Sequence, residues 1–349
     1  MVDFALRPME PTDGPGIDAL MRDVAQSTAV AFTTQYRHDV YQSLLAQHPT
    51  LFGVVATAPG ADGLVGVATA FIEEVNAGGR TYPCAHLENL KVRQDFRRKG
   101  LGSRLADWRI EEARRRFGGE GIIATDIEIS NAASLATARR WCTQVLGPVR
   151  VVIARVSTKP TAADRIRVRE LAEEETEAVV DAMNAYYEGF ELFPRQTPVT
   201  LAASLAPTSL ADTIRTYRVA VADDGTILAG AAVTERFKLM TDHVDRIPRP
   251  LELLGRVIPL FPPDRVIRTI ELSLAWHAPG RLDAGRMLWD AIRYEWRDRA
   301  THVAGQADPR GPLIDFFHVG RTMIPRVQLM VPVQSPVPLD ESRPVYVWR

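Results

Sequence analysis

The sequence predicts an α/β protein with mixed sheets, built as two consecutive domains of similar plan. The chain has 349 residues, about twice the size of a typical domain. Short apolar segments typical of strands alternate with amphipathic segments typical of helices, and this order occurs twice along the chain. A polar segment that contains proline, residues 158–164, separates the two occurrences and is the best candidate for a linker. We therefore expect one domain over residues 1–157 and a second over residues 165–349.

The first domain is predicted to follow the order β-α-α-β-β-β-α-β-α-β. The turn at residues 59–63 contains proline and two glycines and predicts a hairpin between the strands on either side. Asp13 and Asp18 lie near the positive end of the first expected helix, where the helix dipole favours them. The expected strands are 4–8, 51–57, 64–72, 82–92, 122–129 and 149–156, and the expected helices are 12–29, 35–47, 101–117 and 132–145.

The second domain repeats this order with little likeness in sequence. A hairpin is expected around residues 223–225, where two aspartates precede a glycine. Residues 237–264 form an insert between the third and fourth expected strands. The expected strands are 165–171, 217–222, 226–236, 266–276, 303–306 and 324–333, and the expected helices are 173–189, 285–299 and 312–319.

Composition excludes several classes of protein. The chain carries 42 basic and 43 acidic residues, a net charge of −1, which gives no electrostatic reason to expect nucleic acid or an anionic membrane as partner. No apolar run reaches the roughly 18–20 residues that span a bilayer, and the first residues lead directly into a strand, with no room for a signal peptide. Cys84 and Cys142 are too few for a disulfide framework or a metal cluster. We expect a cytoplasmic protein without a metal, and its preference for arginine over lysine suggests a GC-rich bacterial genome.

Residues 97–102, Arg-Arg-Lys-Gly-Leu-Gly, form a basic turn between a buried strand that ends at Val92 and the helix expected over residues 101–117. Its two glycines let the backbone approach a phosphate group, and the helix N-terminus adds partial positive charge. This phosphate loop lacks the Gly-Lys-Ser/Thr ending of a Walker loop and the G-x-G-x-x-G spacing of a dinucleotide fingerprint. It therefore predicts a pyrophosphate site of another kind.

The pattern Arg97-x-x-Gly100-x-Gly102, five residues after a strand-ending valine, resembles the acyl-CoA loop of the GNAT acetyltransferases. The resemblance continues through the strand at 122–129 and the helix opened by Asn131-Ala-Ala-Ser134. Residues 85–102 are particularly similar to arylalkylamine N-acetyltransferases, which carry two histidines where this chain has His86 and Glu88. The resemblance implies a tandem GNAT fold, by motif in the first domain and by pattern in the second.

The resemblance also implies acetyl-CoA as co-substrate. In this family the pantetheine slots between two separating strands, here 87–92 and 122–129, and backbone N–H groups near Leu90 and Val92 would bond the acyl carbonyl. Asn131 is expected to cap its helix, and that role alone would account for it. The residues that the resemblance implies in acyl-CoA binding are Leu90, Lys91, Val92, Arg97, Arg98, Lys99, Gly100, Leu101, Gly102, Ser103, Asn131 and Ser134.

His86 and Glu88 are the candidate bases. Strand alternation places them on one face with Leu90, and His86 lies six residues before Val92, where histone acetyltransferases of this family carry their base. An imidazole with a pKa near ~6.5, or a glutamate, can accept an ammonium proton directly or through a water. The alternatives are a satisfied core histidine for His86 and, for Glu88, a structural carboxylate that bonds the backbone where the strands diverge.

No proton donor for the leaving thiolate can be assigned. The family often has a tyrosine seven residues after the asparagine, but here that position is Ala138. Tyr36 is one candidate, because it lies in the region expected to line the acceptor site. Asp126 and Glu128 on the next strand either attract a cationic acceptor or form a solvated face, and the solvated face is the favoured interpretation.

The second domain departs from the pattern at the phosphate loop. When Leu288 is aligned with Leu105, Gly280, Asp283 and Gly285 stand where the first domain has Arg97, Gly100 and Gly102. An aspartate at the centre repels phosphate, so weak or no acyl-CoA binding is expected there. The insert with its apolar run at 251–261 is interpreted as a core-packing loop of the second domain, or alternatively as a lid or wall over the acceptor cleft.

These observations favour an acetyl-CoA-dependent N-acetyltransferase that acts on a primary amine of a small molecule, with its chemistry in the first domain, as a monomer or homodimer. The amine would attack the thioester directly. Two alternatives stay open: a non-catalytic acyl-CoA-binding or scaffold protein, and an acyltransferase with a larger acyl donor or a peptide acceptor. The sequence leaves the acceptor and the acyl group undefined.

Overall fold

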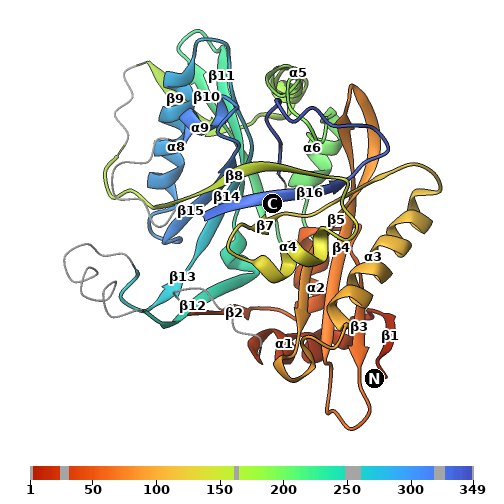
Figure 1. The fold of residues 1–349 in the computed structure, drawn as a ribbon. Helices are drawn as coiled ribbons and strands as arrows, with labels where there is room; N and C mark the ends of the chain where they lie inside the picture. The colour runs from red at the N-terminus through yellow and green to blue at the C-terminus, as the bar shows by residue number, and fades with distance from the viewer. Residues whose placement is uncertain (1–2, 24–30, 161–164, 248–260, 318–326, 348–349) are drawn as a thin grey trace. The chain divides into compact units, whose positions relative to one another are not determined.

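A computed structural model describes residues 3–23, 31–160, 165–247, 261–317 and 327–347, and they form two compact units (Figure 1). Unit 1 comprises Met1–Leu146, Leu239–Val266 and Met330–Leu339, and unit 2 comprises Gly147–Lys238, Ile267–Leu329 and Asp340–Arg349. These bounds differ from the single break expected at residues 158–164, because each unit contains chain from both halves of the sequence. The mixed α/β fold predicted from the sequence is confirmed.

Unit 1 is built on a mixed sheet whose strands pair in the order β1-β3-β4-β5-β6. The first four strands pair antiparallel, whereas β5 and β6 are parallel. Beyond β6 lies the end of β16, where Val333 pairs with Ala124 and Gln334 with Ile123. The strands are β1 (Ala5–Pro8), β3 (Phe52–Thr57), β4 (Gly66–Ala77), β5 (Arg80–Val92), β6 (Ile122–Ala124), β7 (Ile127–Glu128) and β16 (Val327–Gln334).

The helices of unit 1 are α1 (Gly14–Asp23), α2 (Val40–Gln47), α3 (Leu101–Phe117) and α4 (Ala132–Ala138). The helix α3 has the predicted bounds, since Gly100 before it and Gly118 after it both adopt left-handed backbone conformations. It lies along β4 and β5 (Figure 1) and buries Leu101, Leu105 and Ile110 against them. The helices predicted at 12–29 and 132–145 are shorter, and residues 24–30 lie outside the described part of the chain.

A second, small sheet of unit 1 corrects two predictions. It consists of β2 (Ala31–Tyr36), β12 (Met240–Arg246) and β13 (Val266–Ile267). The first residues of the helix predicted at 35–47 therefore belong to a strand, which pairs antiparallel with β12. The pairing also places most of the insert in unit 1, so its interpretation as a core loop of the second domain is wrong. Most of the apolar run at 251–261 lies outside the described residues.

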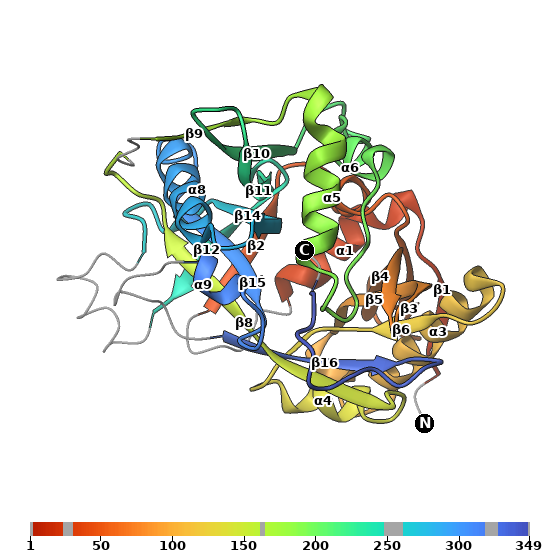
Figure 2. The ribbon, with the colours of Figure 1, turned by 90° about the horizontal axis from the view of Figure 1, so that it is seen from above.

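Unit 2 is built on a sheet of the same kind, in the order β8-β15-β14-β11-β10-β9. Here β14 and β15 are parallel, and the other neighbours are antiparallel. The helix α8 packs on this sheet (Figure 2) and buries Trp289 in one core cluster with Ile270 and Leu272 of β14. The elements are β8 (Gln144–Arg155), β9 (Ile166–Glu170), β10 (Arg215–Ala222), β11 (Ile227–Thr234), β14 (Thr269–His277), β15 (His302–Ala307), α5 (Thr176–Tyr186), α6 (Pro198–Leu205), α8 (Leu282–Glu295) and α9 (Leu313–Phe316).

The closing strand of each sheet comes from the other half of the sequence. The strand expected to close the first domain is β8, but its residues from Arg150 to Arg155 pair with β15 in unit 2. The last residues of β16 close the sheet of unit 1 instead. Both segments were predicted as strands, and only their partners differ from the expectation. An open edge at β6 or β15 would leave backbone N–H and C=O groups unpaired. A closing strand from either half of the sequence can pair with these groups.

The two sheets share a β-bulge at corresponding positions. In unit 1 the register passes from Val67–Lys91 to Thr69–Glu88, so β5 has one extra residue, and Asn89 has a φ of 49°. In unit 2 the register between β11 and β14 shifts in the same way, and Leu274 also has a φ of 49°. A left-handed conformation is uncommon for residues other than glycine. Its occurrence in both sheets supports the predicted internal repeat of fold.

Gly102 of α3 and Gly285 of α8 are aligned positions with different surroundings. A Cβ atom on Gly285 would lie 2.8 Å from Cδ2 of the buried Phe316, whereas one on Gly102 would have Leu90 Cδ2 at 3.8 Å as its nearest neighbour. We predict that Gly285→Ala lowers the free energy of unfolding by about 1–3 kcal/mol. The control Gly102→Ala should be neutral or slightly stabilising, because alanine favours a helix over glycine by up to about 1 kcal/mol. Urea unfolding measures both, and equal stability of the two variants would contradict the prediction.

Candidate functional site

The strands β5 and β6 diverge immediately after His86. They pair only from Cys84–Ile122 to His86–Ala124. After this point Thr125 Oγ1 donates to the carbonyl of Leu87 at 2.8 Å, and the backbone N–H of Thr125 turns to Pro332 O at 3.2 Å. The separation that the family resemblance implies is thus present between these strands. The part of β5 that follows, Leu87–Val92, contains the bulge and the residues expected to contact an acyl carbonyl.

The phosphate loop lies at the end of this same strand. A 3₁₀ turn (Gln94–Phe96) follows β5, and Arg98 and Gly100 adopt left-handed conformations, with φ of 59° and 84°. A Cβ atom on Gly100 would meet nothing within 4 Å, so the loop is open on that side. The first N–H groups of α3 have no acceptor within the helix. The loop therefore offers bare backbone donors at the positive end of a helix, which fits a pyrophosphate.

Cations surround the start of α3. Arg97, Arg98 and Lys99 are exposed. Arg140, which follows α4, adds a further guanidinium, because its Nη1 donates to Ser103 Oγ at 2.6 Å. Within the described part of the chain, no carboxylate lies within 4.0 Å of these four basic groups. Sequence reasoning missed Arg140, because nothing in the local pattern places the end of α4 beside the first turn of α3.

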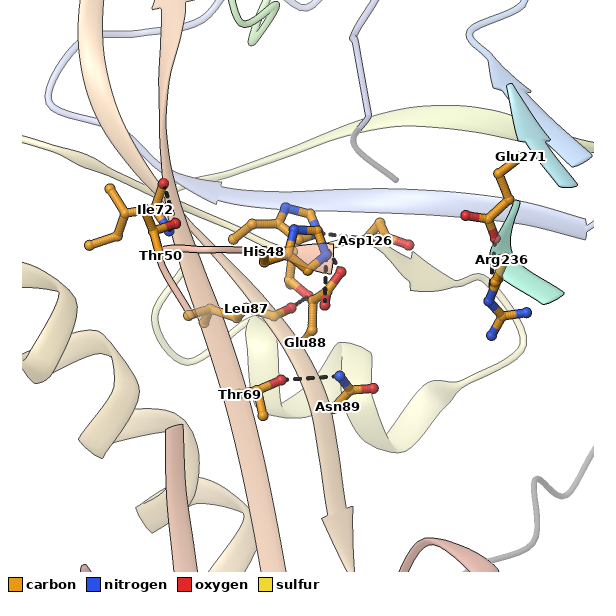
Figure 3. Close-up of polar contacts among 12 residues, drawn as sticks. His48, Thr50, Thr69, Ile72, Leu87, Glu88, Asn89, Asp126, Arg236 and Glu271 are labelled. Atoms are coloured by element: carbon orange, nitrogen blue, oxygen red, sulfur yellow. Dashed lines mark hydrogen bonds and ion pairs between the residues drawn. The ribbon is translucent and has the colours of Figure 1, made fainter. Parts of the chain in front are cut away.

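His86, Glu88, Asp126 and His48 form a polar cluster beside the divergence. His86 Nε2 lies 2.9 Å from Asp126 Oδ1 and 4.0 Å from Glu88 Oε1. The other carboxylate oxygen of Glu88 lies 3.9 Å from His48 Nε2. Figure 3 shows the side chains of His48, Glu88 and Asp126 pointing toward one another. One carboxylate therefore stands between two imidazoles.

The surroundings of His86 raise its pKa above the ordinary value. Burial is the largest single influence and lowers the pKa, because it disfavours the imidazolium. The hydrogen bond to Asp126 and the negative charges of Asp126, Glu88 and Glu73 act in the opposite direction and together outweigh burial. The favoured interpretation of Asp126 as part of a solvated face is thus wrong, since its side chain is only 17% exposed and bonds His86.

The side chains of the cluster differ in their exposure to solvent. The side chain of His86 is 1% exposed, that of His48 12% and that of Glu88 26%. Glu88 is therefore the member that a dissolved molecule reaches most easily, and His86 lies behind it. His48, the C-cap residue of α2, is stacked on Phe71 at a ring-centroid distance of 3.8 Å. Sequence reasoning missed His48, since only the fold brings the end of α2 to β5.

The remaining candidates are arranged as follows. Asn131 Oδ1 accepts from the backbone N–H of Ser134 at 3.1 Å, which confirms its predicted capping role. The helix α4 ends at the buried Ala138. Tyr36 lies in β2, and its hydroxyl is 3.6 Å from Met21 Sδ. The assignment of a proton donor stays open.

The comparisons with known proteins agree with this geometry. Residues 17–142 match the acetyltransferase (GNAT) family. The chain carries a GNAT acetyltransferase domain. No curated protein matches the sequence.

Solved structures match the fold over almost the whole chain. The N-myristoyltransferase of Saccharomyces cerevisiae with bound myristoyl-CoA superposes with a TM-score of 0.61 at 12% identity, covering 95% of this chain and 79% of that one. A GCN5-related N-acetyltransferase from Sphaerobacter thermophilus gives a TM-score of 0.57 at 15% identity and covers 97% of both chains. N-myristoyltransferase has two GNAT-like halves. Its full-length match, with a family match in the N-terminal part alone, fits the predicted tandem GNAT fold.

In the second GNAT-like half, the bulge is bonded by the chain's own tyrosines. The backbone N–H of Leu274 donates to Tyr346 Oη at 3.3 Å, and Tyr217 Oη donates to Leu274 O at 3.1 Å. Tyr187 Oη donates to the next carbonyl, Ala275 O, at 2.5 Å. The backbone polar groups at this bulge are therefore already bonded within the protein.

The loop before α8 is also unlike the phosphate loop. Asp283 accepts two hydrogen bonds from the guanidinium of Arg281, which lowers the pKa of that carboxyl and keeps it charged. The charge of Arg281 is thus neutralised by Asp283, a residue at the start of the same helix. This supports the expectation that the second half binds acyl-CoA weakly or not at all.

The described residues contain no group of three or more His, Cys, Asp or Glu side chains that could hold a metal ion. Among the helices of the same residues, none is long and apolar enough to span a bilayer.

Asp126→Asn tests the electrostatics of the GNAT-domain cluster. Removing the carboxylate leaves burial as the dominant influence, so the pKa of His86 should fall. In the wild type the raised pKa stabilises the folded state at pH values below the unfolded-state pKa of about 6.5. That contribution is lost as the pH rises through the folded-state pKa. NMR titration of the His86 imidazole measures the change, and Asp245→Asn, which removes an exposed carboxylate bonded to Thr33, is the control. An unchanged His86 pKa in Asp126→Asn would refute the assignment.

Proposed function

We propose that the protein is an acetyl-CoA-dependent N-acetyltransferase that acetylates a primary amine of a small molecule in unit 1. The observation that carries the proposal is the layout of β5. One strand bears the Glu88–His86 pair, the bulge and the separated segment, and it ends at the open phosphate loop. The proton acceptor, the site for the reacting carbonyl and the site for the donor's phosphates thus follow one another along one strand and the loop at its end.

The phosphate loop and the first turn of α3 bind the pyrophosphate of the donor. The backbone N–H groups of Gly100–Ser103 and the charges of Arg97, Arg98 and Lys99 supply the attraction. The pantetheine extends along Leu90–Val92 in the gap that β6 leaves. Backbone N–H groups of that segment bond the acyl oxygen, which becomes more negative in the transition state and is then stabilised most.

Glu88 accepts the proton of the incoming ammonium, directly or through a water. The free amine then attacks the thioester carbon and a C–N bond forms. The C–S bond breaks with release of the thiolate, and the nitrogen loses its second proton to water to give the amide. The proton on Glu88 passes to His86 or His48, whose nitrogens lie about 4 Å from the carboxylate oxygens. The thiolate takes a proton from water, since no protein donor is assigned. The carboxylates of Glu88 and Asp126 favour a cationic amine as the acceptor.

A larger acyl donor is the second candidate. The structure of N-myristoyltransferase that shares this fold was solved with myristoyl-CoA. A series of acyl-CoA donors from two to fourteen carbons, assayed for thiol release with one amine, separates the two proposals by where kcat/KM is greatest. A non-catalytic acyl-CoA-binding role would give binding without thiol release for every donor and amine.

Gly100→Asp should abolish acetyl-CoA binding, because it places a carboxylate in the open centre of the phosphate loop. Calorimetry with acetyl-CoA measures the affinity. Gly118→Asp is a matched control, since Gly118 is also left-handed and open but lies at the other end of α3. Gly100→Asn controls for backbone strain alone. Unchanged affinity in Gly100→Asp would remove the loop from the donor site.

Glu88→Gln and His86→Ala should each lower kcat by about 10²–10⁴-fold, with little change in acetyl-CoA affinity. The reason is that each variant removes a proton acceptor and leaves the phosphate loop intact. Thiol release with a panel of primary amines measures the rate. Asp245→Asn again serves as the control. Rates near the wild-type value in both variants would return the pair to a structural role.

A further inference from the structure

Arg109 is a buried cation on the face of α3 that packs against the sheet. The residue is 3% exposed. Its Nη1 donates to two backbone carbonyls, Thr69 O on β4 at 2.8 Å and Glu88 O on β5 at 2.7 Å. These carbonyls belong to the pair of residues at the edge of the β5 bulge. The guanidinium thus joins the two strands at the point where their ladder is interrupted.

Burial of the Arg109 guanidinium costs free energy of folding. Burial lowers the pKa of Arg109 to about 9, although the charge of Glu88 opposes the shift. Within the described residues, Arg109 has no carboxylate within 4.0 Å, and its buried Nε has no hydrogen-bond partner. A buried charge without an ion pair, and a buried donor without an acceptor, each cost free energy.

The second half of the chain shows that the bulge does not require a buried cation. The bulge of β14 has the same register shift and the same φ of 49° at Leu274. In the alignment of the two helices, Ile292 stands where α3 has Arg109, and it is fully buried. Neutral tyrosine hydroxyls bond that bulge instead. Geometry alone therefore does not explain why the first half carries a guanidinium there.

One bond of Arg109 acts on a peptide group of the β5 bulge. The Glu88 carbonyl and the Asn89 N–H belong to one peptide group, so a charged donor on the carbonyl polarises the N–H and strengthens it as a donor. The register pairs neither Asn89 nor Leu90 with a residue of β4. Asn89 Nδ2 also donates to Thr69 Oγ1 at 3.1 Å, which is a second bond that ties the bulge to β4.

We infer that Arg109 is a positioning residue for acyl transfer: it fixes the β5 bulge and polarises the Glu88–Asn89 peptide group so that N–H groups of the bulge stabilise the oxyanion of the thioester. The inference rests on the proposed acyl-CoA-dependent function. Arg109 touches neither the donor nor the amine and acts through the backbone of Glu88–Leu90. Its loss should weaken the interaction with the acyl carbonyl and leave the binding of the phosphates unchanged.

The test compares wild type, Arg109→Met and Arg109→Lys, with Arg115→Met as the control. Arg115 lies on the same helix but is 66% exposed and pairs with Glu112. Calorimetry measures the affinity for CoA and acetyl-CoA, and infrared difference spectra of [1-¹³C]acetyl-CoA measure the stretching frequency of the bound thioester carbonyl. Thiol release with the amine panel gives kcat and KM.

In Arg109→Met, kcat should fall by about 10²–10³-fold, the size of effect seen when one oxyanion donor is lost. The downward shift of the carbonyl frequency on binding should disappear, while CoA affinity stays within about threefold of wild type. Arg109→Lys, which keeps a charged donor, should recover part of both the rate and the shift. If Arg109→Met does not fold, Arg109→Lys still tests the inference, and the CoA affinity of Arg109→Lys shows whether that variant is folded.

A wild-type carbonyl shift and turnover that persist unchanged in both Arg109 variants would overturn the inference. A rate loss that accompanies an equal loss of CoA affinity in both variants would also overturn it, because that result describes structural damage. Failure of the proposed function gives a different result, in which the wild type itself binds no acyl-CoA or releases no thiol.

Discussion

The interruption of pairing along β5 is the constraint on which the site depends. A strand that is paired on both sides has no backbone groups to offer a ligand, because its N–H and C=O groups are used by the ladder. Here the bulge at Asn89 breaks the pairing with β4, and the short β6 ends the pairing on the other side. The carbonyls released in this way are bonded by Arg109 and Thr125. Asn89 and Leu90 are left without a register partner on β4, and the phosphate loop follows at the end of the same strand.

Local signals predicted the elements well and their partners poorly. The bounds of α3 follow from a glycine at each end, and the hairpins of both halves follow from their glycine turns. By contrast, the predicted helix at 35–47 begins too early. Residues 35 and 36 end β2, a strand that exists through pairing with β12, about 200 residues away in sequence. The exchange of the closing strands β8 and β16 has the same cause. Periodicity indicates that a segment is a strand, but the strand with which it pairs is determined by tertiary packing.

The candidate site was predictable only where its residues share one strand. Alternation along β5 placed His86 and Glu88 on one face, whereas His48 and Asp126 join them through the fold. The sequence also contains a signal for Arg109. It falls on the apolar face of α3 with Leu105 and Ile110, where a charge is unusual. In a helix rich in arginine, the position of a charge relative to the apolar face distinguishes the buried guanidinium from the solvated ones.

The two halves keep one backbone and differ in how its freed polar groups are satisfied. In unit 2, hydroxyls of Tyr187, Tyr217 and Tyr346 bond the backbone at the bulge, and Phe316 presses against Gly285 at the start of α8. The backbone N–H and C=O of Leu274 thus have internal partners, and Gly285 has a steric neighbour. In unit 1 the corresponding glycines are open, and the cations around them have no carboxylate partners among the described residues. The same strained bulge is thus stable with tyrosine hydroxyls in one half and with a guanidinium in the other. The fold can therefore keep its shape in both halves, although only unit 1 keeps an open phosphate loop.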